Sequence, residues 1–536
     1  MHNERDYMLI KGFVGFWGNI QRNKMSKSLC DKYESAIYNG VSFFNERYAV
    51  VFSDEYLVEQ DRDRIIFNSG KDSLSDIDEL MVTIDISSNV LRIDRDRWGT
   101  RMTYYVLDEE NIYFASDMRF LLELPLDNIK EYDQESILEN ATLGYIYNDE
   151  RTLFSRIKQL PRNCRLESKD GVFTVSKKLI SSEKSRFVSF EEACLAFEEA
   201  FEKSVSDTCK MNGNRAYFLS GGMDSSAIAI AASKTEQINT ISFSSGNNSE
   251  DVYYAGKLAE CINSKHTVLQ FDDDKALMAF PFFLNAIENV EMAGIFSPLG
   301  GFAYYLLCQE VKNRGFDIAF PGEGADEILG GYYWQLTHTF GFVDRLKEKT
   351  KGTNVYDRVV NLFPEVEERK IYREIAYYLL QGTALTNYHL SCVEHIAKSF
   401  GMFNYPVFMT ERVDNIVKDI PMDWLCDGEN TKLVMRNYLS KHVDNAGLSG
   451  LITRKKLAMP SVVTNSFYSK INKLAEKEII LSKNPFKEIL GNYPLNTLML
   501  DVFHKYYTMK PLEDISVDMW KEDVVKIDNG ECIIYW

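Results

Sequence analysis

Markers of several protein classes are missing from this sequence of 536 residues. Its nine cysteines include no CxxC pair, and an odd number at irregular spacing is typical of reduced thiols rather than of a disulfide framework or a zinc site. Lys and Arg number 61 against 79 Asp and Glu, so neither nucleic acid nor an anionic membrane is expected as a partner. No apolar run approaches the roughly 20 residues of a membrane span, and the first residues are too briefly apolar for a signal peptide. We therefore expect a soluble, cytoplasmic protein.

The length of the chain favours two domains, because a single compact core stops growing well before this size. In the first third, short β-branched and aromatic runs alternate with turn residues, a spacing that predicts a β-rich sandwich. From Ser189 onward long helical periods take over, and the charged stretch 179–189 predicts the boundary. We assign one domain to residues 1–185 and a second to residues 186–536. The predicted strands of the first domain include residues 47–53, 79–86, 90–94, 103–107 and 111–116.

The second half opens with an α/β pattern. Residues 216–220 are predicted as a buried strand, 225–233 as a helix and 238–244 as the next strand. Strands that alternate with helices predict a parallel sheet, whose ligand site lies at the carboxyl ends of the strands. A loop rich in glycine and serine, SGGMDSS at residues 220–226, lies at one such end.

This loop has the composition of a phosphate-binding turn. Its glycines let a ligand approach the backbone, and the N–H groups of the turn and of the helix start point at one spot. No lysine follows, so it is not the GxxxxGK[ST] loop of phosphoryl-transfer enzymes. The alternative, a surface turn that caps a helix, accounts less well for so specific a pattern. The candidate ligand-binding residues are Ser220, Gly221, Gly222, Asp224, Ser225 and Ser226.

A second loop, PGEGADEILGGY at residues 321–332, follows a short predicted strand at 318–320. The first loop resembles the pyrophosphate-binding motif of the ATP pyrophosphatases, which adenylate a substrate by cleaving ATP between its α- and β-phosphates. The second is similar to the GEGADE…GGY signature of asparagine synthetases. The resemblance implies ATP and Mg²⁺ as cofactors, with the metal on Asp224 and Asp326, and it adds Gly322 and Gly324 to the nucleotide site. A glycine-rich acidic loop without a ligand is the alternative.

Three further segments extend the resemblance. Residues 249–260 match the start of the family's next helix, and ENTKLVMRNYL at 429–439, which contains Lys432, resembles its ETKxxLR helix. Residues 454–457, RKKL, resemble its RxKxGF stretch, whose lysine meets the pyrophosphate and the developing negative charge. This assigns a catalytic role to Lys456, with a solvated basic loop end as the alternative. Glu323 is the second catalytic candidate, as a general base that accepts a proton from the attacking ammonium.

The resemblance also covers the amino-terminal half, through residues 95–122 and 152–166. It implies an α/β fold overall: an Ntn-hydrolase-like αββα sandwich of the glutaminase type, followed by an ATP-pyrophosphatase (adenine nucleotide α-hydrolase-like) parallel-sheet domain with extra carboxy-terminal helices. Family members that hydrolyse glutamine begin with a catalytic cysteine, and Lys11 stands at that position here. Because lysine has no thiol to form a glutamyl thioester, we predict a degenerate glutaminase domain.

The acceptor region departs from the family as well. Residues 393–409 correspond to the stretch in which asparagine synthetases carry a Glu and an Arg. By alignment these positions fall on Met402 and Asn404, while Pro406 and Phe408 are approximately retained. Apolar and neutral side chains therefore replace the charged groups of the aspartate site.

Three interpretations compete. The lost cysteine and the altered acceptor favour the glutaminase-dead branch that resembles β-lactam and lasso-peptide macrolactam synthetases: a Mg²⁺- and ATP-dependent, AMP-forming amide ligase of natural-product biosynthesis. Glu323 disfavours the β-lactam members, which have tyrosine there, and fits an ammonia-dependent asparagine synthetase. A non-catalytic nucleotide-binding relative is the third. The expected partners are a small-molecule or peptide carboxylate with its amine and, for a lasso-type enzyme, a leader-peptide-processing protein. The sequence leaves open the two substrates, intra- or intermolecular coupling and the oligomeric state.

Overall fold

The computed structural model describes most of the chain up to Thr453 and two short strands near the carboxyl end. The described residues are 12–18, 27–37, 39–44, 48–53, 56–61, 64–68, 80–109, 111–143, 146, 150–178, 187–244, 250–270, 279, 282–283, 286–287, 298–332, 339–353, 355–364, 375, 377, 381, 385, 389–427, 429–443, 448–453, 526–528 and 531–533.

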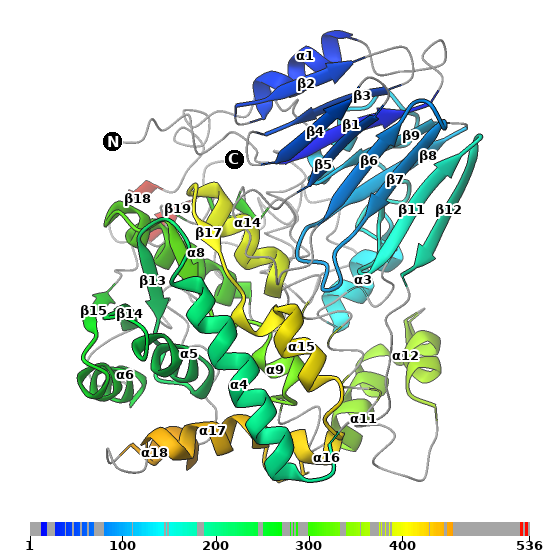
Figure 1. The fold of residues 1–536 in the computed structure, drawn as a ribbon. Coiled ribbons are helices and arrows are strands. Elements are labelled where there is room, and N and C mark those ends of the chain that lie inside the picture. Colours follow the sequence, from blue (N-terminus) through cyan, green and yellow to red (C-terminus); the bar gives the residue numbers. More distant parts are fainter. Residues whose placement is uncertain are drawn as a thin grey trace.

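Two antiparallel sheets of six strands make up the amino-terminal half (Figure 1). The first has the strand order β10-β8-β9-β1-β3-β2 and the second β12-β11-β7-β6-β5-β4. The strands are β1 (Phe13–Trp17), β2 (Val41–Phe44), β3 (Tyr48–Phe52), β4 (Leu57–Asp61), β5 (Arg64–Asn68), β6 (Met81–Asp85), β7 (Val90–Asp94), β8 (Tyr104–Asp108), β9 (Asn111–Ala115), β10 (Lys158–Gln159), β11 (Cys164–Lys169) and β12 (Val172–Lys177).

The alternation of side chains along each strand explains how the first sheet is covered on both faces. In β1, Phe13 and Trp17 lie in the core between the two sheets. Val14 and Phe16 point the other way, into a core shared with helices α1 (Lys27–Ala36) and α2 (Met118–Leu122). A further helix, α3, spans Gln134–Leu143.

A five-stranded parallel sheet organises the second half. Its order, β15-β14-β13-β16-β17, places the first strand in the chain between the second and the fourth. Such a reversal of strand order opens a crevice at the carboxyl ends of the two central strands. Here these strands are β13 and β16, so the two candidate loops meet at this crevice. The strands are β13 (Arg215–Phe218), β14 (Asn239–Ser244), β15 (Lys265–Gln270), β16 (Ile318–Phe320) and β17 (Phe403–Asn404).

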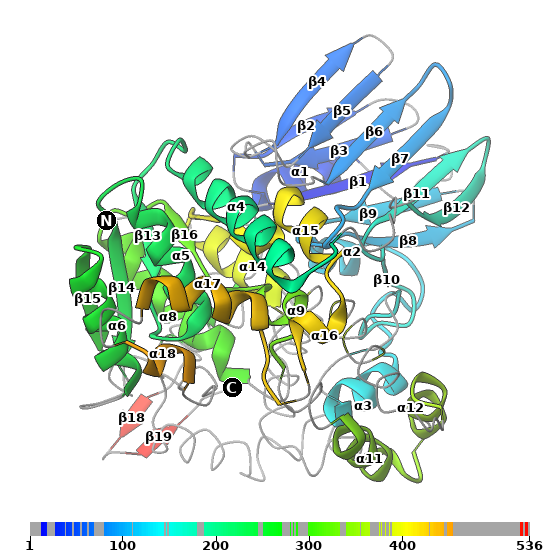
Figure 2. The same cartoon turned by 60° about the horizontal axis from the view of Figure 1, so that its bottom comes forward.

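Helices cover both faces of this sheet (Figure 2). One face packs against α4, α5 and α17, and the other against α8 and α14. The helices are α4 (Phe190–Thr208), α5 (Met223–Ser233), α6 (Glu250–Cys261), α8 (Pro298–Asn313), α9 (Ala325–Ile328), α11 (Thr339–Thr350), α12 (Tyr356–Leu362), α14 (Ser391–Ser399), η5 (Val407–Met409), α15 (Glu411–Val417), α16 (Met422–Leu425), α17 (Leu433–Val443) and α18 (Gly450–Thr453), with a β18 (Lys526–Asp528) and β19 (Glu531–Ile533) hairpin.

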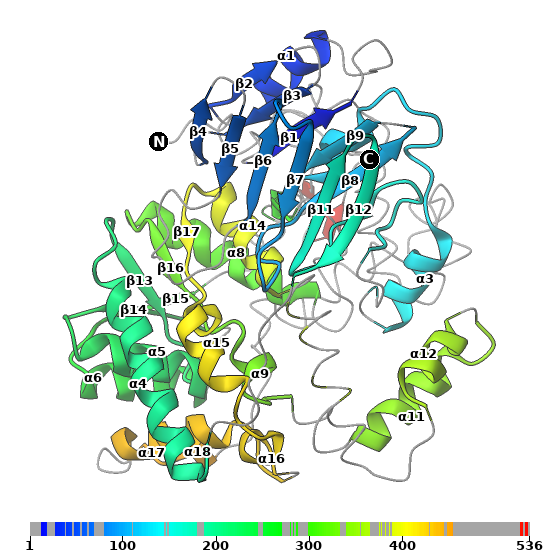
Figure 3. The ribbon, with the colours of Figure 1, turned by 45° about the vertical axis from the view of Figure 1, so that its right-hand side comes forward.

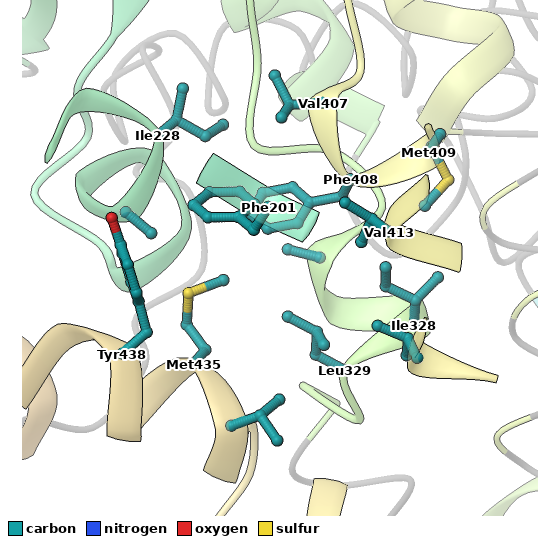
Figure 4. Close-up of a cluster of buried hydrophobic side chains, with 14 of the residues drawn as sticks. Phe201, Ile228, Ile328, Leu329, Val407, Phe408, Met409, Val413, Met435 and Tyr438 are labelled. Atoms are coloured by element: carbon teal, nitrogen blue, oxygen red, sulfur yellow. The ribbon is translucent and has the colours of Figure 1, made fainter. Parts of the chain in front are cut away.

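A buried cluster beneath the crevice fixes the helices that carry the candidate site (Figure 4). Phe201 of α4 stacks on Phe408 of η5 with ring centroids 5.1 Å apart, and Tyr438 of α17 meets Phe201 edge-on at 5.6 Å. Ile328 of α9 and Ile228 of α5 are buried in the same cluster. Burying a side chain of this size stabilises a fold by about 1.5–3 kcal/mol. The cluster therefore holds α5, α9 and α17 at fixed distances.

Ionic contacts join the two halves. Arg97 pairs with Asp414 of α15, and Arg101 pairs with Glu394 of α14. Arg358 of α12 forms ion pairs with Glu135 and Glu139 of α3. Figure 3 shows α11 and α12 beside α3. The predicted boundary residues 179–186 lie outside the described residues, and the division at residue 185 stays a prediction.

The α/β fold class is confirmed, with antiparallel sheets preceding a parallel one. Strands predicted at residues 90–94 and 318–320 are β7 and β16, and the helix predicted from Ser189 is α4. Ser189 caps α4 by accepting a hydrogen bond from the Glu192 N–H, and its acidic first turn suits a helix amino terminus. Within the described part of the chain, no helix has the length and apolarity that crossing a membrane demands.

Candidate functional site

The first candidate loop leaves β13 at a fixed point. The Leu219 N–H donates to the Ile241 carbonyl oxygen over 2.8 Å, and the Ser242 hydroxyl donates to the Leu219 carbonyl oxygen. The chain then turns through Ser220 and Gly221 and enters α5 with Gly222 at its N-cap position. Because Gly222 supplies no capping side chain, the first turn of α5 is suited to receive an anion.

Serine side chains organise the same turn. The Ser220 and Ser225 hydroxyl oxygens lie 3.0 Å apart, and the Ser220 Oγ accepts a hydrogen bond from the Gly222 N–H over 3.2 Å. The Ser226 Oγ is fully buried and has no hydrogen-bond partner among the residues that the structure describes. A buried hydroxyl without a partner costs about 1–3 kcal/mol, so a ligand oxygen at this helix start would satisfy it.

Gly221 is required by both conformation and space. Its φ of +72° lies in the left-handed region, and a Cβ at this position would overlap the Asp251 carbonyl oxygen in the first turn of α6. The loop therefore packs directly on α6.

Gly221→Ala is expected to lower both the midpoint of thermal unfolding and the affinity for ATP, because α6 must shift to admit the methyl group. Gly171→Ala is the matched control, since Gly171 has a φ of +78° and nothing within 4 Å of its Cβ position. The control carries only the backbone strain, roughly 1–2 kcal/mol. Equal losses in the two variants would show that the packing of Gly221 on α6 is unimportant.

The two predicted metal ligands lie together, and a lysine lies between them. The Lys432 Nζ is 2.6 and 2.7 Å from the two carboxylate oxygens of Asp224 and 2.7 Å from Asp326 Oδ1. The Lys432 side chain is 1% exposed, and the two carboxylates are about one fifth exposed. Burial disfavours the charge on Lys432, but the two aspartates outweigh it and raise the pKa of its ammonium.

Local backbone features let Lys432 reach this position. Its φ is +55°, which turns the side chain inward just before α17 begins at Leu433. A Cβ on Gly331 would overlap both Asp326 and Lys432, so a glycine is needed there. Gly322 has Asp224 Cβ 3.1 Å from its own Cβ position, which brings the two loops into contact. The second loop therefore packs on the first and places Asp326 beside Asp224 at the Lys432 ammonium.

The donor set fits the predicted magnesium ion. Asp224 and Asp326 already share one buried cationic nitrogen, and carboxylates converging on a single point beside phosphate oxygens are the ligands that Mg²⁺ prefers. They would hold the ion, with the Lys432 ammonium as an additional balancing charge. Another group with metal-binding geometry, Glu198, Glu202 and His442, lies elsewhere. Its two carboxylates are paired with Lys441 and Lys234, so their charge is already balanced.

Glu323, the predicted base, belongs to a second polar group. Its Oε2 lies 3.4 Å from His389 Nδ1, and the His389 Nε2 lies 3.1 Å from the Tyr332 hydroxyl oxygen. That hydroxyl donates to Glu327 Oε1 over 2.5 Å. Glu327 is 2% exposed, and burial raises the pKa of its carboxyl against the pull of His389.

The remaining predicted positions have different outcomes. Gly324 has a φ of +88° at the N-cap of α9, where its Cβ would overlap Met409. Lys11 and Lys456 lie outside the described residues, so their roles stay predictions. Met402 and Asn404 are buried, and Asn404 Oδ1 accepts a hydrogen bond from the Tyr304 hydroxyl over 2.8 Å. Neither of these two side chains offers a charged group to a substrate.

Sequence reasoning missed the contacts of two residues. Lys432 lay in a matched segment, but no role was assigned to it because its aspartate partner Asp224 is 208 residues away in the chain. His389 carries no signal in the sequence, since a single histidine outside any recognised motif has no pattern that points to a partner.

Comparisons of the sequence with known proteins identify the family of this chain. The sequence profile named asparagine synthase matches residues 196–522, and the profile named glutamine amidotransferase domain matches residues 65–178. The chain is 28% identical over 324 residues to the putative glutamine-hydrolyzing asparagine synthetase 1 of Methanocaldococcus jannaschii, covering 59% of this chain and 55% of that protein. It is 27% identical over 273 residues to the glutamine-hydrolyzing asparagine synthetase 3 of Bacillus subtilis, covering 47% and 42%.

The chain thus spans about half the length of the curated relatives it matches. Among solved structures, NMN synthetase from Francisella tularensis aligns with a TM-score of 0.21 and 16% identity over 40% of this chain and 94% of that one, a likeness too weak to carry an argument. The asparagine synthase profile covers more than half of the chain, through both candidate loops and Lys432. The protein therefore belongs to the asparagine synthetase family of carbon–nitrogen ligases.

Proposed function

We propose that this protein is an ATP-dependent, AMP-forming amide ligase that adenylates a carboxylate and couples it to an amine that does not come from glutamine. One observation carries the proposal. Asp224 and Asp326 lie 102 residues apart in the chain, and both carboxylates contact the buried ammonium of Lys432. Beside them α5 begins at an N-cap glycine, which has no side chain to cap the helix. This arrangement suits a nucleoside triphosphate with its metal. The SGGMDSS loop itself does not carry the lysine of the GxxxxGK[ST] loop of phosphoryl-transfer enzymes.

Each group of the site has a distinct task in this proposal. The α5 start and the Ser226 hydroxyl bind phosphate oxygens of ATP, and Mg²⁺, when bound, neutralises their charge. Lys432 balances the charge of Asp224 and Asp326. Glu323 accepts a proton from the substrate ammonium, and the lone pair of the resulting amine attacks the carbonyl carbon of the acyl adenylate and displaces AMP. A carboxylate suits this task because it can take up the proton reversibly.

Cys30 supports the exclusion of glutamine as the amine donor. It is the first cysteine of the chain, and it lies on α1 with its side chain buried in the core that this helix covers. Burial, and to a smaller extent the negative charges of Asp31 and Glu34, raise the pKa of its thiol to about 11. Almost no thiolate is therefore present at neutral pH. Together with Lys11 at the family's cysteine position, this supports a glutaminase domain that serves as a scaffold.

We therefore expect the purified protein to release no glutamate from glutamine, with or without ATP. The measurement is a coupled glutamate assay against a heat-inactivated sample. Steady release of glutamate above that background would contradict the assignment of Lys11 and the account of the first domain.

The nucleotide chemistry has its own test. A carboxylate substrate should support exchange of radiolabelled pyrophosphate into ATP in the presence of Mg²⁺, and turnover should yield AMP. Amino acids, β-amino acids and peptides with side-chain carboxylates form the screening panel. Asp224→Asn and Asp326→Asn should each lower the exchange rate severely by weakening metal binding. Formation of ADP as the stoichiometric product would contradict the proposal. If no carboxylate in the panel supported pyrophosphate exchange, a non-catalytic nucleotide-binding relative would be favoured.

Two substrate classes compete within the proposal. Buried, neutral Met402 and Asn404 in place of charged acceptor residues favour a specialised or peptide substrate, as in lasso-type macrolactam formation with a leader-peptide-processing partner. Glu323 favours an ammonia-dependent asparagine synthetase. An activity assay with aspartate and with ammonium as the sole amine distinguishes the two classes, because only an ammonia-dependent asparagine synthetase forms asparagine from this pair.

A further inference from the structure

His389 connects the loop carboxylate Glu323 to a rigid, buried anchor. One ring nitrogen, Nδ1, lies within ion-pair distance of Glu323 at 3.4 Å, and the other, Nε2, lies 3.1 Å from the Tyr332 hydroxyl. Tyr332 in turn donates to the buried Glu327. The main chain of Glu327 is held as well, since its carbonyl oxygen accepts from Gln381 Nε2 over 3.3 Å.

The environment favours a doubly protonated imidazole. Burial lowers the pKa of His389, but Glu323 and Glu327 outweigh it, so the pKa is raised. In its charged form the ring would donate from both nitrogens, from Nδ1 to Glu323 and from Nε2 to the Tyr332 oxygen. The Oε2 oxygen of Glu323 is then engaged by the ring.

We propose that His389 is a positioning residue that holds the Glu323 carboxylate in the orientation in which it accepts the proton of the attacking amine. This role rests on the proposed ligase function. In the step concerned, the ammonium N–H bond breaks and an O–H bond forms on Glu323. The freed lone pair of the amine makes the new C–N bond, AMP leaves with the electron pair of its C–O bond, and the excess proton left on the nitrogen passes to the departing phosphate. His389 touches none of the reacting atoms.

The pair can be tested without any substrate. Thermal unfolding of the full chain is measured for Glu323→Gln, His389→Gln and the double variant. If His389 holds Glu323, the second substitution shifts the midpoint much less in the presence of the first than alone. Additive shifts would overturn the proposal. His395→Gln is the matched control, because the His395 Nδ1 faces the Ser391 carbonyl oxygen in α14. It should add its own shift in full to that of Glu323→Gln.

The function of the pair is tested on separate half-reactions. With a carboxylate that supports pyrophosphate exchange, His389→Leu should leave the exchange rate and the KM for that carboxylate unchanged. It should lower amide formation about 10–100-fold, because a misplaced reacting group costs this much. His389→Gln retains hydrogen-bonding capacity and should recover part of the loss. Hydroxylamine, which is mostly unprotonated at neutral pH, should still trap the adenylate at the wild-type rate.

The outcomes separate the two proposals. Equal losses of exchange and amide formation in His389→Leu would show a general structural role and overturn the positioning role. Unchanged amide formation would overturn it too. If no carboxylate supports exchange in the wild-type protein, the proposed ligase function fails, while the thermal-unfolding cycle still decides whether His389 holds Glu323.

Discussion

Replacement of Lys432 by methionine is expected to destabilise the metal-free protein by about 3 kcal/mol, near the lower end of the cost of leaving buried charges without their partner. Methionine keeps most of the side-chain volume and has the same backbone strain at a φ of +55°, so the lost cation dominates. Asp224 and Asp326 would then face each other uncompensated. The measurement is the thermal midpoint in EDTA, since a chain of this length is not expected to unfold in two states.

Magnesium should reverse part of this loss. A divalent cation can bind the two carboxylates that Lys432 releases, and a ligand that binds only the folded state raises its stability. Millimolar Mg²⁺ should therefore raise the midpoint of Lys432→Met more than that of the wild type. Adding Asp326→Asn to Lys432→Met should abolish the excess. A Lys432→Met protein no more responsive to Mg²⁺ than the wild type would contradict the assignment of these carboxylates as metal ligands.

Lys441→Met provides the control for the size of the effect. Lys441 lies on α17 like Lys432's neighbours, but it is 40% exposed and pairs with Glu198 at the surface. Exposed ion pairs contribute about 0–1 kcal/mol, so this variant should stay close to the wild type in EDTA.

Periodicity predicted much of the fold, and the misses have physical causes. The strand expected at residues 216–220 ends at Phe218: the Leu219 N–H still donates to Ile241 of β14, but the chain then turns into the loop. Helix α5 begins at Met223, two residues earlier than expected, because Gly222 takes the N-cap position. Strand β17 has only two residues, too few for any alternation to be visible in the sequence.

The candidate site divides in the same way. The sequence could single out residues within one loop, such as Gly221 and Asp224, because a tight turn has a composition of its own; their roles in binding phosphate and metal stay predictions. The ion pair of Lys432 and the contact of His389 with Glu323 join residues far apart in the chain. Such contacts depend on how α17 and the segment before α14 pack, which no local pattern encodes.

The last prediction concerns Lys456, which lies three residues beyond the end of α18. The carbonyl oxygen of Ile452 in α18 accepts from Arg436, and Gly450 packs so closely on Tyr254 of α6 that a Cβ there would overlap the ring. The first turn of α6 in turn contacts the phosphate loop at Gly221. The end of α18 at Thr453 is therefore anchored beside α6, and Lys456 follows Thr453 by three residues in the sequence.

Lys456→Ala is therefore expected to lower amide formation about 10²–10³-fold, the usual contribution of a preorganised cation where negative charge develops. The thermal midpoint and ATP binding should persist, because the proposed metal ligands and the SGGMDSS loop are untouched. Lys456→Arg should recover only part of the rate, since a planar guanidinium does not replace a compact ammonium. Lys455→Ala is the control and should be mild. A silent Lys456→Ala beside a crippling Lys455→Ala would mean that the catalytic lysine of this segment is Lys455.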